Sequence, residues 1–253
     1  MKLLACSLGL LIAGSSPAIA AQAPAVLQSP AGSAESKASR VTAAALARTV
    51  APKDVLLPVE IEQARKMVLA LPAMDEDAKQ LEQEYPGLYA AVWTAVEPEM
   101  RRQTEADYPS FWTMLEDLYI RRLTEQEAQA VLVFFKSTTG QKLTRSMYGS
   151  LDATPWLAEM IKSDSSTVSE AQMQGVIDAA KTKAVQQIGP EDEANLEALA
   201  AKISLDDFRA LGAETQKLTL DWVNQEDPEG EEKLAKIMEA AMERYMDAHP
   251  PKN

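Results

Sequence analysis

The sequence predicts an all-α protein, a multi-helix bundle of about eight to ten helices, on three observations. Apolar residues recur at helical spacing from about residue 41 onward. Prolines, glycines and capping pairs interrupt that pattern at intervals typical of helix ends. No stretch between turn signals alternates polar and apolar residues convincingly, so strands are not expected.

The first 20 residues have the features of a secretion signal. Lys2 supplies a positive charge, residues 3–13 are apolar, and Ala18 and Ala20 form a small-residue site before Ala21 at which a signal peptidase would cut. We therefore expect residues 1–20 to be removed and the mature protein to be periplasmic or secreted.

Composition limits the chemistry of the mature chain. Cys6, the one cysteine, lies inside the expected signal, so no thiol would remain for disulfides or thiolate metal sites. The formal net charge is −13, and loss of Lys2, the one charged residue of the signal, would leave −14. Such an acidic chain repels phosphate backbones, so we expect no nucleic-acid partner. The longest dense apolar run, residues 130–135, is too short for a transmembrane segment.

Residues 21–40 are rich in Ala, Ser, Gln and Pro, and we interpret them as a flexible leader because they bury too little apolar surface to offset the entropy of ordering. Residues 41–253 are expected to form the helical domain. Three helices are predicted in its first part: one from Pro58 that Pro72 ends, one from Pro86 that closes near Pro98, and one that begins at Pro109.

Helices continue in the second half. Thr167 and Glu170 are predicted to form a capping box before one of them, and Ser204 is predicted to begin another. After a turn at residues 227–230, the last helix carries the apolar residues Leu234, Ile237, Met238, Ala241, Met242, Tyr245 and Met246.

Residues 123–127 and 203–207 share an apolar residue, a hydroxyl cap and an acid three residues later. A degenerate duplication is one interpretation, with residues 165–248 as the second half. The other is that capping boxes recur in any helical protein.

Residues 123–143 form the most distinctive segment. Thr124 is expected as the N-cap, with Glu127 as its reciprocal partner. The following residues are too apolar for a solvent-facing helix, so this helix should be central. Ser137 can cap a new helix, and Gly140 permits close approach of another backbone. We expect a helix–break–helix element.

This segment resembles the core motif of the bacterial secreted family called domain of unknown function 2059, in which an acidic capping box leads to an aromatic pair, Ser-Pro and Gly-x-Lys. The matching positions are Thr124, Glu127, Phe134, Phe135, Ser137, Gly140 and Lys142. Thr138 stands where proline is common and Phe135 where tyrosine is frequent. The resemblance implies a helical, exported protein and carries over no catalytic residue.

Candidates for chemistry are few. His249, the one histidine, lies beside two prolines near the C-terminus, so triads and other histidine-based systems are not expected. We predict no metal site and no cofactor: the acidic runs 75–77 and 226–232 lack the spacing of a calcium loop. Paired carboxylates acting on a glycosidic bond remain an alternative. The candidates are Glu82, Glu84, Glu97, Glu99, Glu116 and Asp117.

The stripe Met238, Met242 and Met246 has two interpretations, a core face or a surface that grips varied apolar clients. The core face is favoured. The four tryptophans, Trp93, Trp112, Trp156 and Trp222, are interpreted as packing anchors. We therefore expect a noncatalytic binding or interaction module, with an envelope protein or an apolar ligand as its partner. A cell-wall-directed hydrolase is the alternative, and a purely structural module is a third interpretation.

Overall fold

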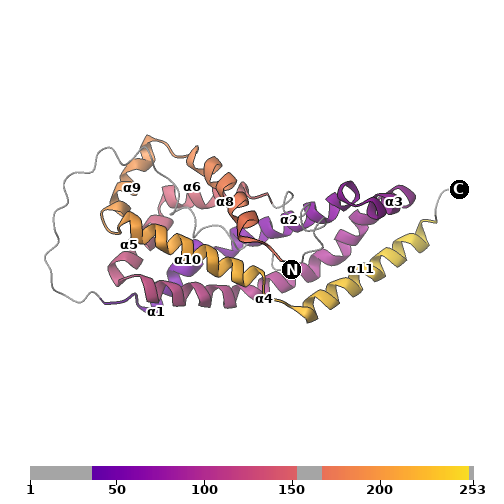
Figure 1. The fold of residues 1–253 in the computed structure, drawn as a ribbon, viewed down its shortest axis with the longest axis horizontal. Helices are drawn as coiled ribbons and strands as arrows, with labels where there is room; N and C mark the ends of the chain where they lie inside the picture. The colour runs from indigo at the N-terminus through magenta and orange to yellow at the C-terminus, as the bar shows by residue number, and fades with distance from the viewer. Residues whose placement is uncertain (1–35, 153–166, 251–253) are drawn as a thin grey trace.

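The computed structural model describes residues 36–152 and 167–250, and it confirms the all-α prediction (Figure 1). Within these ranges the one extended pairing is an isolated bridge between Lys37 and Thr124. The helices are α1 (Arg40–Val50), α2 (Lys53–Met74), α3 (Glu76–Glu84), α4 (Leu88–Arg122), α5 (Glu125–Lys136), α6 (Thr138–Gly149), α8 (Glu170–Val185), the short 3-10 turn η2 (Pro190–Asp192), α9 (Glu193–Ala200), α10 (Leu205–Val223) and α11 (Pro228–Ala248). None of these helices combines the length and the apolar content that a membrane crossing requires.

The molecule is elongated, with a thick body and a thinner arm (Figure 1). We call residues 64–103 and 228–248 the arm; it holds the end of α2, α3, the start of α4, and α11. The remaining described residues form the body. The buried apolar side chains of both regions belong to one continuous cluster, so one core runs from the body into the arm.

The long helix α4 joins the two regions and corrects the sequence prediction. Separate helices were expected before Pro98 and after Pro109, but α4 runs unbroken through both prolines for 35 residues. A proline inside a helix removes one hydrogen bond and costs about 3 kcal/mol. Both prolines are exposed on α4, whereas neighbouring turns bury large residues such as Val96 and Phe111. Burial of that face therefore outweighs the local cost of each proline.

The same reasoning corrects α2. The predicted helix began at Pro58 and ended before Pro72, whereas α2 begins at Lys53 and ends at Met74 with both prolines inside. Leu56, in the turn before Pro58, is fully buried. Packing against the body extends the helix beyond its local signals.

The chain joins the fold earlier than predicted. Residues 36–40 were assigned to a flexible leader, but the backbone N–H of Ala38 donates to Leu123 O at 3.0 Å and Ala38 is buried. The Glu125 carboxylate accepts from the Ser39 N–H at 2.6 Å and the Thr42 hydroxyl at 2.5 Å. These hydrogen bonds lower the pKa of Glu125 to about 2. The predicted signal and residues 21–35 lie outside the described residues.

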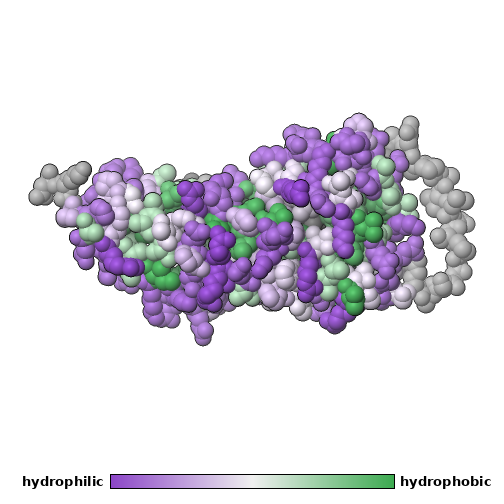
Figure 2. All heavy atoms as spheres, turned by 180° about the vertical axis from the view of Figure 1, so that it is seen from behind, coloured by the Kyte–Doolittle hydropathy of each residue, from purple (hydrophilic) through white to green (hydrophobic). Residues whose placement is uncertain are grey.

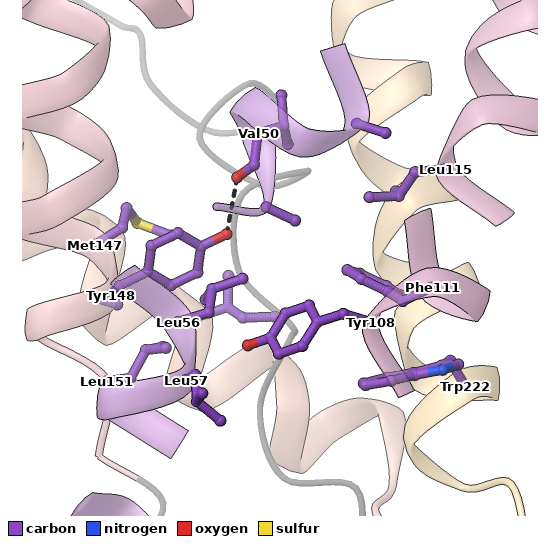
Figure 3. Packing of buried hydrophobic residues seen from close by; sticks show 14 of the residues in the cluster. Val50, Leu56, Leu57, Tyr108, Phe111, Leu115, Met147, Tyr148, Leu151 and Trp222 are labelled. Carbon is purple, nitrogen blue, oxygen red and sulfur yellow. Dashed lines mark hydrogen bonds between the residues drawn. The ribbon is translucent and has the colours of Figure 1, made fainter. Parts of the chain in front are cut away.

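The core of the body gathers around the middle of α4. Phe111 of α4 packs against Trp222 of α10 with ring centroids 4.7 Å apart, and the Tyr148 hydroxyl of α6 donates to Val50 O at 3.1 Å (Figure 3). The Trp112 indole N–H donates to Ala51 O at 3.0 Å. These contacts, with the burial of Trp93, confirm the packing role predicted for three of the four tryptophans. Trp156 lies outside the described residues.

One predicted cap in the second half is wrong and one is confirmed. Ser204 caps α10 as predicted, accepting from the Asp207 N–H. The cap of α8, however, is Ser169 with Gln172, two residues beyond the predicted Thr167 and Glu170. Asn224 is the reason: its side chain accepts from the Val168 N–H at 2.8 Å and donates to the Val168 carbonyl at 2.9 Å. Val168 is therefore held outside the helix.

Candidate functional site

The helix–break–helix element is built as the sequence predicted. Thr124 accepts from the Glu127 N–H, and Glu127 accepts from the Thr124 N–H at 2.8 Å, which completes the capping box. The Ser137 hydroxyl donates to Phe134 O at 2.6 Å and accepts from the Gly140 N–H at 3.2 Å. One side chain therefore ends α5 and begins α6.

Gly140 lies where the two helices touch. A Cβ added there would stand 2.1 Å from Phe134 O and 2.6 Å from the Cα of Phe135. Phe134 and Phe135 are buried, with their rings edge to face at 5.2 Å. A glycine is therefore required for α6 to leave α5 at this angle.

The last motif residue, Lys142, reaches a partner about fifty positions away. Its ammonium lies 2.9 Å from Asp192 Oδ2 and 3.0 Å from Glu191 Oε1. Asp192 is buried and also accepts from the Thr139 hydroxyl at 2.7 Å and the Gly189 N–H at 3.0 Å. The Lys142 ammonium, with these donors, lowers the pKa of Asp192 to about 2. This network ties α6 to η2 and α9.

A buried acid that the sequence prediction missed lies where the arm meets the body. Glu60 of α2 is 2% exposed, and its Oε2 accepts from the Tyr108 hydroxyl of α4 at 3.1 Å. Its Oε1 has no hydrogen-bond partner among the described residues. Burial raises the pKa of Glu60 well above 4.5, with a further contribution from Asp107, while the Tyr108 hydrogen bond opposes the rise. Glu60 is therefore predominantly protonated at pH values just above 4.5.

Four of the six acids chosen from the sequence have partners in caps or ion pairs. Glu82 accepts from the backbone N–H groups of Gly87 and Tyr89. Three of the acids form ion pairs: Glu97 with Arg101, Glu99 with Arg102 and Lys233, and Glu116 with Arg48. Glu84 and Asp117 are exposed. The Arg102 hydrogen bond, with Lys233, lowers the pKa of Glu99 to about 2. Glu60, whose pKa is raised by burial, is not one of these six acids. Among these six acids, Asp117 lines a groove between α4 and α10, together with Glu214 and Asp221 of α10.

A groove of about 550 Å³ lies between α4 and α10 and is lined by both apolar and charged side chains, among them Asp117, Arg121 and Glu214. Glu214 also pairs with Arg122. No group of His, Cys, Asp or Glu in residues 36–152 and 167–250 is arranged to hold a metal ion. The acidic runs act as caps instead: Asp75 accepts from the Ala78 N–H and Asp227 from the Gly230 N–H. His249 is exposed and stacks on Tyr245.

The methionine stripe of α11 is neither fully buried nor fully exposed. Ala241 is the one buried residue of α11, and Met238, Met242 and Met246 are half-buried against the core cluster. In the arm, α11 packs chiefly on α4. The structure thus supports the core interpretation for one side of the stripe and leaves its other side at the surface.

The comparison with known families identifies the central segment. Residues 110–162 match the DUF2059 family. Its model is described as an uncharacterized protein conserved in bacteria, and the match confirms the resemblance drawn from the motif. No curated protein and no solved structure matches the chain.

The DUF2059 match covers the end of α4, all of α5 and α6, and residues up to 162, of which 153–162 lie outside the described residues. Within it, the motif residues cap helices, fill the core, fix the α5–α6 angle or, in the case of Lys142, pair with Asp192 and Glu191. The arm lies outside the match, apart from the shared helix α4.

Proposed function

We propose that this protein is an exported, noncatalytic binding module of the bacterial cell envelope, and that the α11 side of the arm is its binding surface. Export is supported by the expected signal at residues 1–20 and by the resemblance to a secreted bacterial family. The partner is an envelope protein or an apolar ligand.

One observation carries the proposal. A globular helix normally buries its apolar stripe against several neighbours. Helix α11 packs chiefly on α4, so its larger apolar side chains stay half-exposed. Apolar side chains reach the surface of the arm at several places (left half of Figure 2). On α11 these side chains include Met238, Met242 and Met246, which share one side of the helix and can be covered by a partner.

The hydrolase alternative has no comparable support. It requires two carboxyls facing one groove, one of them with a raised pKa. The carboxyl whose pKa burial raises, Glu60, lies against Tyr108 and does not line the groove between α4 and α10 that Asp117, Glu214 and Asp221 share.

Site-specific photocrosslinking in living bacteria tests the binding surface. A photoreactive residue at Ala235, exposed on α11, should crosslink to a defined partner, while one at Ala179, exposed on α8 of the body, should not. Equal crosslinking from both positions, or none from Ala235, would contradict the proposal.

Cell fractionation tests export. Mass spectrometry of the purified protein should give an N-terminus at Ala21, and the protein should be recovered from the envelope or the medium. An intact precursor that stays in the cytosol contradicts export.

A further inference from the structure

The arm contains three neighbouring helices, with α4 lying between α2 and α11 (Figure 1). Both neighbours run antiparallel to α4. Lys53 at the start of α2 pairs with Glu105 of α4, and Asp75 just after α2 faces Tyr89 near the start of α4. Helix α11 begins near Gln103, which donates to Gly230 O at 3.2 Å, and ends where the Tyr245 hydroxyl donates to Pro86 O at 2.6 Å.

This arrangement leaves a place for a further helix. Helices α2 and α11 both pack on α4 and make few contacts with each other. In a four-helix bundle, each helix packs its apolar stripe against neighbours on both sides around a common core. In the described chain the arm supplies three long helices, and α3 is a short one of nine residues.

Helical geometry shows which side of α11 is open. Ala241 is buried and therefore marks the line that faces α4. Successive residues turn by about 100°, so Met242 and Met246 lie about 100° and about 140° round the helix from Ala241. The exposed Ala235 lies on the same side, about 120° from Ala241. We call Ala235, Met238, Met242 and Met246 the methionine flank.

Met side chains and small residues together suit the docking of another helix. Methionine is unbranched and polarizable, so it adapts to varied apolar side chains. An apolar helix face is recognised through anchors spaced by three, four and seven residues, and the flank offers contacts at matching intervals along α11. The small Ala235 lets a partner approach closely.

Charge restricts the kind of helix that fits. Helix α11 carries six acids and three bases. Two of those bases are already paired: Lys233 with Glu99, and Lys236 with Glu232. The exposed Glu231 and Glu239 lie about 80° and about 160° round α11 from Ala241, on the side of the methionine flank, so negative charge borders the flank. A second copy of this acidic surface and an anionic membrane would both be repelled.

We infer that the methionine flank binds a basic amphipathic helix of a partner protein, which packs beside α11 and α4 as a fourth helix of the arm. The partner's apolar face covers the methionines, and its Lys and Arg residues lie against the acids of α11. This inference rests on the proposed function and names the chemistry of its partner.

Fluorescence anisotropy with synthetic peptides tests the inference. The full chain, purified from bacteria after its own processing, is titrated into a labelled helical Leu/Lys peptide of about 20 residues, a length that matches α11. Two controls are a scrambled peptide of the same composition without an apolar face and a Leu/Glu peptide with the same apolar face. We expect the Leu/Lys helix to bind at least about tenfold more tightly than either control, because both the charge and the apolar face are required.

Variants locate the site. Met242→Gln and Met246→Gln should each raise the Kd by about fivefold to tenfold, because each removes an apolar contact without changing the charge. Ala240→Gln, on the exposed opposite side of α11, is the matched control and should leave the Kd unchanged. Circular dichroism of each variant verifies that the protein is folded.

Three outcomes would overturn the inference. The first is that the scrambled peptide or the Leu/Glu peptide binds as tightly as the Leu/Lys peptide. The second is that a folded Met242→Gln/Met246→Gln protein binds the Leu/Lys peptide as tightly as the unmodified chain does, and the third is that light scattering shows a dimer that these substitutions dissociate. If Ala235 crosslinks to a partner and one of these results is also obtained, the proposed function stands and only the inferred chemistry of the partner is contradicted. If Ala235 gives no crosslink, the proposed function itself is contradicted.

Discussion

Replacing Glu60 by glutamine should make the protein more stable at neutral pH, by an amount that grows with pH. Folding places this carboxyl beside Tyr108, with one oxygen unpartnered among the described residues. Its pKa in the folded protein is raised above 4.5 by burial. The stabilising contribution of the bound proton is thus complete below about pH 4.5 and is lost as pH rises toward the folded-state pKa.

The magnitude follows from proton linkage. Between the unfolded and folded pKa values, folding takes up one proton at Glu60, so the free energy of unfolding falls by about 1.4 kcal/mol per pH unit. Glutamine has the same shape and does not ionise, so Glu60→Gln removes that slope. The difference in the free energy of unfolding between the variant and the unmodified chain should therefore grow by about 1.4 kcal/mol per pH unit in that window.

Urea unfolding followed by circular dichroism at about pH 5, 6 and 7 measures this difference. Glu62→Gln is the matched control, because Glu62 is exposed on the same helix. Subtracting the control removes the contribution of charge loss on α2. If the Glu60→Gln and Glu62→Gln profiles run parallel to the profile of the unmodified chain, Glu60 is ionised in the folded protein and the reasoning is refuted.

Three further substitutions test the other contacts by urea unfolding. Gly140→Ala should lower the free energy of unfolding by about 1–3 kcal/mol or more, because the added Cβ would overlap the α5 backbone. Gly175→Ala is the control: Gly175 lies in α8 with open space around it, so the substitution should raise the free energy of unfolding by about 0.5–1 kcal/mol. Destabilisation by both substitutions would contradict this reasoning. Asp192→Asn should destabilise the protein at neutral pH far more than Glu191→Gln, since Asp192 is buried and Glu191 exposed. The contribution of Asp192 is present above its ordinary pKa of 3.8 and should fade as pH falls through about 2, so equal effects of the two substitutions, or one that persists at about pH 2, would count against the ion pair. Ser169→Ala should lower the free energy of unfolding by about 1 kcal/mol, because it removes the N-cap of α8. No change would indicate that Thr167, and not Ser169, caps this helix.

The sequence predicts those parts of the fold that depend on local chemistry. The caps at Thr124 and Ser204, the break at Ser137 and the all-α class all follow from residues within a few positions of each other. The continuity of α4 is different, because exposed prolines inside a buried amphipathic helix give the same local signal as helix ends. The α8 cap also depends on a distant residue, Asn224.

The site was less accessible from the sequence. Glu60 has one signal, since it precedes Ala64 and Met67 by four and seven residues and so lies on the apolar side of α2. That signal is weak beside the exposed Glu62, and no local pattern points to Tyr108 as its partner. The Lys142–Asp192 pair joins residues about fifty positions apart, so it requires the tertiary fold.

The unbroken course of α4 places two distant parts of the molecule on one element. Its first residues form the tip beside α3 and α11, while its last turns, from residue 110, belong to the DUF2059 match. The tip of the arm and the residues matched by the family therefore lie on one continuous helix, with Pro98 and Pro109 between them.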